Sequence, residues 1–562
     1  MKVRLTLALF AATLVSLLAA SPSVGALVPR FALDGSPGPS GSYPFDLTDL
    51  NGTLLFSAEI ERGNELYATS DGRKIRLVRD LLPGPDDGDP SDFTRFGNFV
   101  YFLGYEKNAG YEMWRTNGRS ASLFAEPSPG PDSSNIDFLT VADGFLYFSA
   151  ETPAAGRELW KTDGQATTMV QDLNPGPDGS YPQNLTPFDG QLYFTADTPT
   201  EGSELFRTDG NTISLVYDIW PGASGSEPND FAVLGSHLYF SAYQPGSSRE
   251  LWRTDGVTTA LWSDINPGAG YGSPGGMLTS GDRLFFSADD GVNGEEPWST
   301  DGLTTSMVAD ISPGPDDSNP EDMAPFGNGR MIFNAEDPAH GEEPWVADGS
   351  SANLLRDIWP GEQDSGSSEF FFRNGTAYFN ARDQAHGREL WASNGTGARL
   401  VKDILPGTDG SSPRSFTPYR GDVYFSADDG IRGREIWKLV PADRKVTVKG
   451  PRKLRFRPSG RADLKLTCPA SEATGPCSGK FRLATASKVP YQGKRRSVTL
   501  AGGRFRAAPG KSDTVIVRVS SSERRLLKRV AAARNLNVLA RVRDGAGNSA
   551  RVSIPVRAVM PG

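Results

Sequence analysis

A repeat of about 46 residues runs through most of the chain and constrains its fold more than any other feature. One copy, residues 180–222, reads SYPQNLTPFDGQLYFTADTPTEGSELFRTDGNTISLVYDIWPG. A triplet of the ELW type recurs at intervals of 46 or 47 residues and ends nine times at an aromatic residue: Tyr67, Trp114, Trp160, Phe206, Trp252, Trp298, Trp345, Trp391 and Trp437. A fixed period of this length is typical of a solenoid, a propeller or an array.

Each copy contains four short segments rich in β-branched and aromatic residues, which predicts four strands. In the copy above they are Asn184–Phe188, Gln191–Ala196, Glu204–Thr208 and Thr212–Ile219. Asp189-Gly190 and Asp209-Gly210 suit tight hairpin turns, because Asp-Gly readily adopts positive φ angles. The longest Pro- and Gly-rich connection follows the fourth segment, where the chain of a propeller crosses to the next blade. The first segment is therefore the predicted inner strand and the fourth the outer strand.

The two ends of the repeat region favour a closed ring over a solenoid. The last copy, Ser411–Val440, lacks its fourth segment, and Leu27–Gly38 matches the end of a fourth segment with its loop. Pairing this N-terminal strand with the last copy would remove two exposed sheet edges. We predict an all-β protein whose residues 27–440 form a β-propeller of about nine four-stranded blades, with eight blades as the alternative, closed by the N-terminal outer strand.

The motif ELWKTDG at Glu158–Gly164, with copies at Glu204–Gly210 and Glu250–Gly256, resembles the ELWxxDGT-repeat family of secreted bacterial proteins. The resemblance covers residues 40–440 approximately. It implies propeller-type repeats and no established catalytic activity. Two copies read EPW, with Pro297 and Pro344; since proline removes a donor from the ladder, we expect those two strands to be irregular.

Residues 1–26 have the features of a signal peptide. Lys2 and Arg4 precede an apolar core from Leu5 to Ala20, and small residues follow at Val24-Gly25-Ala26. We therefore predict cleavage before Leu27. No later stretch has 18 apolar residues, so we expect no transmembrane segment. The prediction is a secreted or cell-envelope-associated protein, and a monomer.

The only two cysteines, Cys468 and Cys477, lie nine residues apart. Export makes a disulfide available to them. A metal site is the alternative, but it would need two more ligands nearby, and the three histidines lie far upstream. We predict a Cys468–Cys477 disulfide.

Charge divides the chain near Pro441. Residues 441–562 hold 28 Lys and Arg against 6 Asp and Glu, and residues 1–440 hold 30 against 62. This split predicts a separate C-terminal domain over residues 441–562. Alternating apolar residues in it predict strands of a small immunoglobulin-like β-sandwich at Lys445–Val448, Leu464–Thr467, Lys480–Leu483, Thr514–Val519 and Val538–Val542. Ser521–Asn535 is a predicted short helix capped by Ser521, and Arg543–Asn548 resembles the last hairpin of bacterial immunoglobulin-like domains.

The basic domain is predicted to contact anionic polymers of the cell envelope through residues 445–562. Nucleic acid is not an expected partner, because an exported protein meets little of it. The expected contacts are Lys494-Arg495-Arg496, Arg524-Arg525 and Lys528-Arg529. Docking of this domain against the acidic repeats is the alternative.

A residue present in every copy is expected to hold the blade together rather than to form one site. The repeated tryptophans are predicted to pack between blades: Trp114, Trp160, Trp252, Trp298, Trp345, Trp391 and Trp437. The repeated Asp of the TDG and DI motifs is predicted to form turns and to accept backbone hydrogen bonds. Function is therefore sought where the copies differ.

Five aromatic residues in the inter-blade connections break the pattern. Trp220 and Trp359 stand in DIWPG sequences, and Tyr43, Tyr181 and Tyr271 stand in other connections. Exposed rings beside polar groups suit a glycan or a protein ligand, so these five residues are the predicted ligand-binding residues. The alternative is that each ring covers its own loop.

One acidic loop has the ligand types of a calcium site. Asp289, Asp290, Asn293 and Glu295 supply carboxylate and amide oxygens in a Gly-rich turn, which are hard ligands for Ca²⁺. No EF-hand spacing exists, and solvated turns are the alternative.

Catalytic motifs are missing from the sequence. It has no GxSxG or HExxH, and the three histidines, His237, His340 and His386, lie in different copies. The leading prediction is a secreted, non-catalytic binding or scaffold propeller that recognises an extracellular glycan or protein. The alternative is a secreted carbohydrate-active enzyme, a hydrolase or lyase, with its site at the propeller mouth, because a glycosidase needs only two suitably spaced carboxylates.

Overall fold

The computed structural model describes residues 27–245, 248–268, 270–441, 448–469, 477–508, 510–543 and 549–561. The predicted signal peptide, most of the predicted strand Lys445–Val448 and most of the segment Arg543–Asn548 lie outside this range. One compact unit spans Pro29–Val440, and a second contains the residues from Pro441 onwards.

Nine four-stranded sheets make up the part of the chain that contains the repeats, so the prediction of a nine-bladed β-propeller is confirmed. From the inner to the outer strand, the first three blades are β2(Phe45–Leu50) β3(Thr53–Glu59) β4(Asn64–Thr69) β5(Arg76–Arg79), β6(Ser91–Phe96) β7(Phe99–Glu106) β8(Gly110–Thr116) β9(Ala121–Ala125), and β10(Asp137–Ala142) β11(Phe145–Thr152) β12(Gly156–Thr162) β13(Thr167–Met169). Blades four to six are β14(Gln183–Phe188) β15(Gln191–Thr198) β16(Gly202–Thr208) β17(Ile213–Tyr217), β18(Asn229–Leu234) β19(His237–Tyr243) β20(Arg249–Thr254) β21(Thr259–Ser263), and β22(Gly275–Ser280) β23(Arg283–Asp289) β24(Glu295–Thr300) β25(Thr305–Met307). Blades seven to nine are β26(Glu321–Gly327) β27(Arg330–Asp337) β28(Gly341–Ala347) β29(Ala352–Leu354), β30(Ser368–Arg373) β31(Thr376–Asp383) β32(Gly387–Ser393) β33(Ala398–Lys402), and β34(Arg414–Tyr419) β35(Asp422–Asp428) β36(Arg434–Pro441) β1(Leu27–Leu33).

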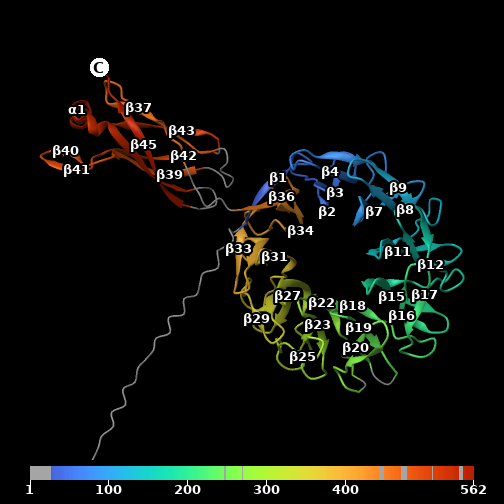
Figure 1. Ribbon diagram of the computed structural model, residues 1–562. Helices are drawn as coiled ribbons and strands as arrows, with labels where there is room; N and C mark the ends of the chain where they lie inside the picture. Colours follow the sequence, from blue (N-terminus) through green and yellow to red (C-terminus); the bar gives the residue numbers. More distant parts are fainter. Residues whose placement is uncertain are drawn as a thin grey trace, which may run out of the picture. The chain divides into compact units, whose positions relative to one another are not determined.

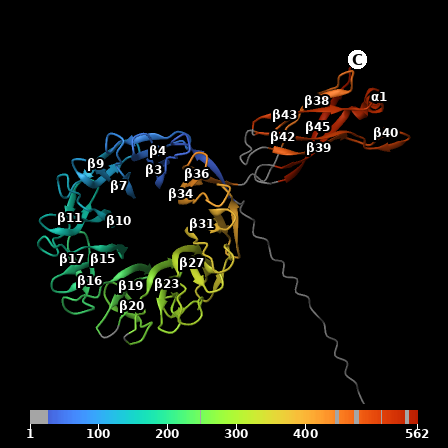
Figure 2. The ribbon, with the colours of Figure 1, turned by 180° about the vertical axis from the view of Figure 1, so that it is seen from behind.

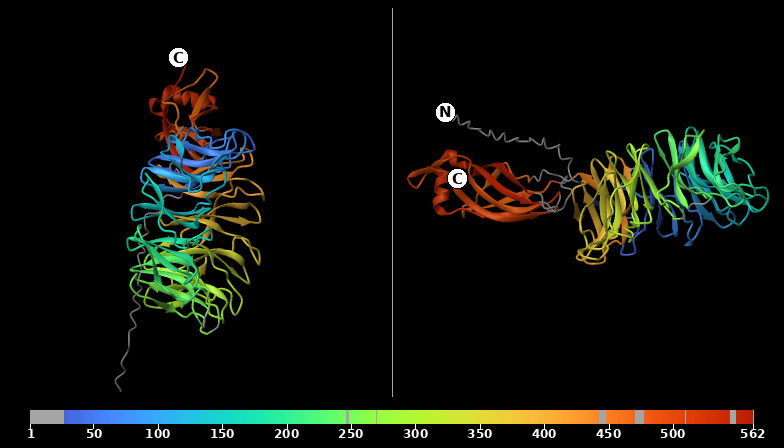
Figure 3. Two further views of the ribbon diagram at one scale, coloured as in Figure 1. Left: turned by 90° about the vertical axis from the view of Figure 1, so that its right-hand side faces the viewer. Right: turned by 90° about the horizontal axis from the view of Figure 1, so that it is seen from below.

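The blades follow one another around a ring in sequence order (Figures 1 and 2) and lie side by side when the ring is seen edge-on (Figure 3). The first strand of each blade contacts the first strands of its neighbours, which places these strands nearest the axis. The predicted assignment of inner and outer strands is therefore confirmed.

The ninth blade takes its outer strand from the N-terminal end of the repeat unit, as predicted. Strand β1 is hydrogen-bonded beside β36, and the ring of Phe31 packs edge-on against Trp437 with centroids 5.7 Å apart. The backbone N–H of Gly35 then donates to Glu435 at 2.9 Å. Strands β2 and β34 also touch, so the first and last blades are neighbours.

Turn chemistry confirms one predicted hairpin and corrects the other. Asp189 and Gly190, between β14 and β15, both have positive φ, 47° and 69°, as a two-residue turn of this kind requires. Asp209 does not: its carboxylate accepts the N–H groups of Asn211 and Thr212 at 2.8 and 3.0 Å, closing a four-residue loop. The predicted role of the TDG aspartate as a backbone acceptor is confirmed.

Proline does not disturb the two EPW strands, so that expectation is wrong. Pro297 and Pro344 pair with Ser287 and Asn334 without a shift of register. The carbonyl of Pro297 accepts from Val308 N, just past the end of β25. The N–H and C=O of one strand residue point to the same side. The N–H that proline lacks would therefore point toward the outer strand at a place where that strand has already ended, so no ladder hydrogen bond is lost.

The repeated tryptophans lie between blades, as predicted. Trp252, in blade five, belongs to a buried cluster that includes Phe188 and Leu205 of blade four. Trp391 likewise joins Phe326 of the preceding blade. The indole nitrogens of Trp114, Trp160, Trp252, Trp298, Trp345, Trp391 and Trp437 have no hydrogen-bond partner in the described part of the chain. Apolar packing is therefore their role.

A buried glutamate in each blade anchors the connection to the next. The side chains of the ELW-type glutamates have no solvent exposure: Glu65, Glu112, Glu158, Glu204, Glu250, Glu296, Glu343, Glu389 and Glu435. Glu204 accepts from Trp220 N at 2.9 Å and from Ser226 Oγ at 2.6 Å. The DI aspartate is predicted to form a turn and to accept backbone hydrogen bonds, but the buried Oδ1 of Asp218 has no partner among the described residues.

Replacing one of these anchors should destabilise the propeller. In Glu204→Ala, Ser226 Oγ and Trp220 N–H would stay buried without an acceptor, so we expect the free energy of unfolding to fall by about 2–5 kcal/mol. Chemical denaturation measures it. Glu362→Ala, at an exposed loop residue, is the matched control, with an expected change below about 0.5 kcal/mol. A loss below about 1 kcal/mol for Glu204→Ala would contradict the anchoring role.

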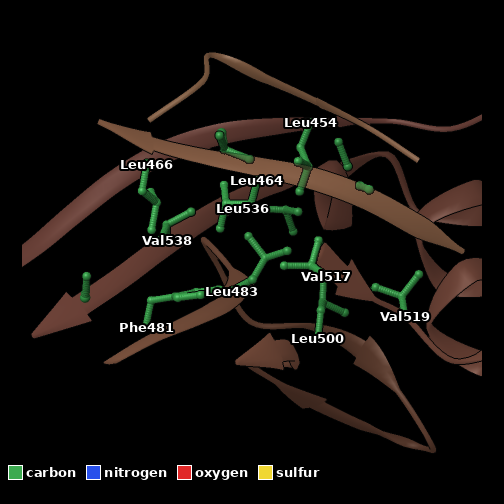
Figure 4. Packing of buried hydrophobic residues seen from close by; sticks show 14 of the residues in the cluster. Leu454, Leu464, Leu466, Phe481, Leu483, Leu500, Val517, Val519, Leu536 and Val538 are labelled. Carbon is green, nitrogen blue, oxygen red and sulfur yellow. The ribbon is translucent and has the colours of Figure 1, made fainter. Parts of the chain in front are cut away.

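The C-terminal unit is a small β-sandwich with its own core. Its sheets are β37(Lys453–Arg455) β45(Ser549–Val559) β44(Asn535–Arg543) β39(Cys477–Thr485) β42(Thr499–Ala507), the pair β38(Arg461–Thr467) β43(Ser512–Arg518), and the hairpin β40(Val489–Tyr491) β41(Lys494–Arg496). Leu464 and Leu466 of β38 pack against Phe481 and Leu483 of β39 in a common cluster (Figure 4). The predicted disulfide is confirmed: Cys468 and Cys477 are bonded, with Cα atoms 5.5 Å apart.

The predicted helix is shorter than expected. Helix α1 spans Ser521–Arg529, and a single 3₁₀ turn, η1(Ala531–Arg534), follows. Its cap is Ser520, not Ser521: Ser520 Oγ accepts from Glu523 N, and the Glu523 carboxylate accepts from Ser520 N at 2.7 Å. Among the described residues, no helix is long and apolar enough to cross a membrane.

Candidate ligand-binding site

Two positions recur around the ring with a left-handed backbone. The rim position lies two residues before each inner strand: Tyr43, Asp89, Asn135, Tyr181, Glu227, Ser273, Asn319, Gly366 and Ser412. The bulge position is the second residue of each inner strand: Asp46, Asp92, Phe138, Asn184, Asp230, Gly276, Asp322, Glu369 and Ser415. All eighteen have φ between 42° and 61°. The backbone is thus the same in every blade, and only the side chains distinguish one position from the next.

A cleft of about 330 Å³ opens between blades four and five. Tyr181 and Asn184 line it from blade four, and Glu227 and Arg249 from blade five. Arg249 is held in place: Nη1 donates to the Glu227 carbonyl at 2.9 Å, and Nη2 lies 3.3 Å from the Glu227 carboxylate. The Arg249 guanidinium also lies over the Tyr243 ring, 4.2 Å from its centroid. A preorganised cation and the half-exposed Tyr181 therefore line the same cleft.

A second hollow, of about 580 Å³, lies along the inner strands β6, β10, β14 and β18. Asp92, Asp137, Phe138 and Asn184 are among the residues that line it. Phe138 is 41% exposed at a position where other blades carry Asp, Asn, Glu, Ser or Gly. An apolar ring thus interrupts a polar wall.

The two hollows meet at Asn184, which lines both. Asn184 Nδ2 donates to the Pro228 carbonyl at 3.3 Å, which fixes the amide. Its Oδ1 accepts no hydrogen bond from the described residues and is available to a ligand. The combined site extends from the Phe138 ring, past the Asn184 amide, to the Tyr181 ring and the Arg249 guanidinium.

Carboxylates give the bulge positions a negative potential. Burial raises the pKa of Asp92 above its ordinary value, and the neighbouring charge of Asp137 raises it further. Burial also raises the pKa of Asp46, Asp230 and Asp322. These inner-strand carboxyls therefore gain a proton more readily than carboxyls in water.

The five predicted aromatic residues do not form one site. Tyr181 lies in the cleft described above, whereas Tyr43, at the rim of blade one, lines a separate hollow of about 700 Å³. Tyr271 precedes blade six outside the rim position, and its carbonyl accepts from Asn266 Nδ2 at 3.3 Å. Trp220 and Trp359 are only partly exposed, and the Arg382 guanidinium covers the Trp359 ring at 4.4 Å. Both tryptophans donate their backbone N–H to a buried glutamate at 2.9 Å, so they belong to the anchored connection.

The acidic loop proposed for Ca²⁺ uses its oxygens internally. Asp289 accepts from Gly291 N at 2.7 Å, and Asp290 accepts from Asn293 N and Nδ2, both at 2.8 Å. The backbone N–H of Glu295 donates to Asp317 at 2.7 Å, which occupies an oxygen of that carboxylate. Within the described ranges, no group of three or more Asp, Glu, His or Cys side chains is arranged to hold a metal ion. The solvated-turn alternative fits this loop better.

Two of the histidines form matching pairs with aspartate. His340 Nδ1 lies 2.7 Å from Asp337, and His386 Nδ1 lies 2.8 Å from Asp383, in equivalent loops of blades seven and eight. Each carboxylate raises the pKa of its histidine. In the described structure neither imidazole is hydrogen-bonded to a serine or a thiol, so these pairs lack the nucleophile of a hydrolase triad.

Phe138, Asn184 and Arg249 were not predicted from the sequence. The five predicted aromatic residues all lie in connections, whereas Phe138 and Asn184 lie on inner strands. Aligning the nine bulge positions in one column would have exposed Phe138 as the single aromatic residue in it. No local signal identifies Arg249, because arginine also precedes the buried glutamate at Arg157, Arg388 and Arg434.

Comparisons with known proteins identify no family for the chain. No family model matches it, and no curated protein matches it significantly. Similar solved structures include Sqt1 of Saccharomyces cerevisiae, 9% identical with a TM-score of 0.33, covering 74% of this chain and 97% of that one. The Aleuria aurantia lectin with α-methyl-L-fucoside is 10% identical with a TM-score of 0.23, covering 45% and 91%. SapL1 lectin with α-methyl fucoside is 13% identical with a TM-score of 0.23, covering 42% and 85%.

Proposed function

We propose that the propeller is a non-catalytic binding protein whose ligand is a glycan, held along the inner strands of blades three to five. The observation that carries this proposal is the meeting of two hollows at Asn184 between two exposed aromatic rings, Phe138 and Tyr181. Sugar rings present C–H faces that pack on aromatic rings, and hydroxyl groups that pair with amide, carboxylate and guanidinium groups. The site offers all of these within one blade and its neighbours.

Substitutions at the two rings test the proposal. We expect Tyr181→Ala and Phe138→Asp each to weaken binding of the best ligand from a glycan array by about 10-fold or more, since each removes a stacking surface. Phe138→Asp also restores the side chain that other blades carry, so the fold should tolerate it. Titration calorimetry measures the dissociation constant.

The matched control is Tyr217→Ala. Tyr217 is 49% exposed, like Tyr181, and belongs to the same blade, but it lies on the outer strand β17. Equal weakening by Tyr217→Ala and Tyr181→Ala would contradict the site, as would an array with no glycan bound.

A glycan-cleaving activity is the second candidate function, and one observation favours it. Asp92 and Asp137 face the same hollow, and the pKa of Asp92 is raised, as a catalytic acid requires. Product analysis after incubation with a polysaccharide panel tests it. Turnover that Asp92→Asn abolishes would support the glycan-cleaving activity. Binding without turnover would support the non-catalytic role.

The remaining sequence predictions concern export, location, oligomeric state and family. We propose that residues 1–26 direct export, that the protein acts outside the cytoplasm as a monomer, and that it belongs with the ELWxxDGT-repeat proteins it resembles. The Cys468–Cys477 disulfide supports an oxidising environment. Mass spectrometry of the culture medium tests export, by detection of a chain that begins at Leu27.

A further inference from the structure

The register of the C-terminal sheet places four cations in one row. Lys480 on β39 lies directly opposite Arg504 on β42 and Arg541 on β44, and Arg541 lies opposite Arg551 on β45. All four side chains are exposed. Since neighbouring strands lie about 5 Å apart, the row holds four positive charges across about 15 Å of one face.

Nothing in the described part of the domain neutralises this row. None of the four side chains has a hydrogen bond or an ion pair with a described residue. Like charges directly opposite each other destabilise a sheet, and one acidic side chain in the row would relieve the repulsion. The arrangement therefore suits a partner that supplies the negative charge.

A trough runs beside the row. Two residues away on each of the four strands, and therefore on the same face of the sheet, lie Gly502, Arg482, Leu539 and Ser553, again directly opposite one another. Gly502 contributes no side chain and Leu539 is 38% exposed, whereas Arg482 adds an exposed cation, so this second row is partly apolar and partly positively charged. Both rows border a hollow of about 920 Å³.

We propose that this face binds an extended acidic polysaccharide, with its carboxylates along the row Arg504, Lys480, Arg541 and Arg551. Guanidinium groups pair with carboxylates in a fork geometry, and the exposed apolar side chain of Leu539 suits the C–H faces of sugar rings. Single-stranded nucleic acid fits less well, because it binds through stacking on exposed aromatic rings. The one aromatic residue bordering the hollow, Phe481, is buried.

Neutralising the row tests the proposal in the full-length chain. Polygalacturonate is the probe, since it carries a carboxylate on every sugar, with dextran as the uncharged comparison. We expect Lys480→Gln/Arg541→Gln to weaken polygalacturonate binding by at least about 10-fold at moderate salt. The slope of the logarithm of the binding constant against the logarithm of the salt concentration should become less steep, by the equivalent of about two released counterions. The unfolding midpoint should stay the same or rise, because repulsion is removed.

The matched control, Lys494→Gln/Arg495→Gln, removes the same charge from the exposed hairpin β40–β41. We expect it to change affinity by less than about 3-fold. Equal weakening by both double variants would overturn the proposal and leave binding to the overall charge of the domain. Tighter binding of oligo-dT than of polygalacturonate at one ionic strength would overturn it in favour of nucleic acid. No binding of either at low salt would also overturn it and favour docking on the acidic repeats.

Discussion

Between pH 5 and pH 8 we expect the thermal unfolding midpoint of the propeller to fall. Burial raises the pKa of Glu65, Glu112 and Glu343 to about 7, above the ordinary value of 4.5. It raises the pKa of the other six anchoring glutamates in the same direction. Nine equivalent groups therefore act together on the stability of one ring.

The sign follows from proton binding. Between pH 4.5 and 7 the folded chain holds protons that the unfolded chain releases, so this stabilisation is complete below pH 4.5 and is lost as the pH rises through 7. For Glu65, Glu112 and Glu343 the loss is at most about 3 kcal/mol each. His340 and His386 act in the same direction, because their pKa is raised. Turn aspartates with a lowered pKa, such as Asp163, lose their contribution below pH 4, so stability should be greatest near pH 5.

Calorimetric melting scans at several pH values measure this dependence. In the triple variant Glu65→Gln/Glu112→Gln/Glu343→Gln, the midpoint should depend less on pH, because glutamine does not titrate. A midpoint that rises from pH 5 to pH 8 in the parent chain would show that the anchors are ionised and stabilising, contrary to the burial argument.

Removal of the closing strand should have the largest effect of any single change. A chain that begins at Ser40 lacks β1, so the edge of β36 is unpaired, Trp437 loses Phe31, and the Glu435 carboxylate loses the Gly35 N–H. Leu33, which is buried, is lost as well. We expect the free energy of unfolding to fall by at least about 5 kcal/mol, from lost apolar burial and strand pairing.

Complementation provides the control for that experiment. A synthetic peptide of residues 27–39 should bind the truncated chain and raise its unfolding midpoint, whereas the same peptide with Phe31→Asp and Leu33→Asp should not. An unchanged midpoint after truncation would mean that the ring does not depend on the closing strand.

The ring could be predicted from the sequence because the same residue pattern occurs nine times. Period, turn residues and the incomplete last copy agree on four strands per blade and on closure by Leu27–Leu33. The anchoring role of Glu204 and its equivalents was not predicted. Its partners, Trp220 N–H and Ser226 Oγ, lie 16 and 22 residues away, and pairing at such a distance leaves no local pattern.

The candidate site was less predictable than the fold. Tyr181 was chosen because it broke the pattern, and it does line the cleft, but Trp220 and Trp359 broke the pattern equally and lie partly buried. A departure from the repeat does not reveal whether the ring turns outward or covers its own loop. The cation row of the C-terminal sheet could not be predicted either, because it depends on the register of four strands separated along the chain.

The left-handed rim and bulge positions would allow the number of binding sites on the ring to change. Because the backbone there is the same in all nine blades, a second binding site would need only side-chain substitutions, such as an aromatic residue at another bulge position, with no insertion or deletion. Each added site would appear at a spacing fixed by the blades. A ligand with repeated epitopes would then be held by several weak contacts at once, and its residence time would rise steeply with each site gained.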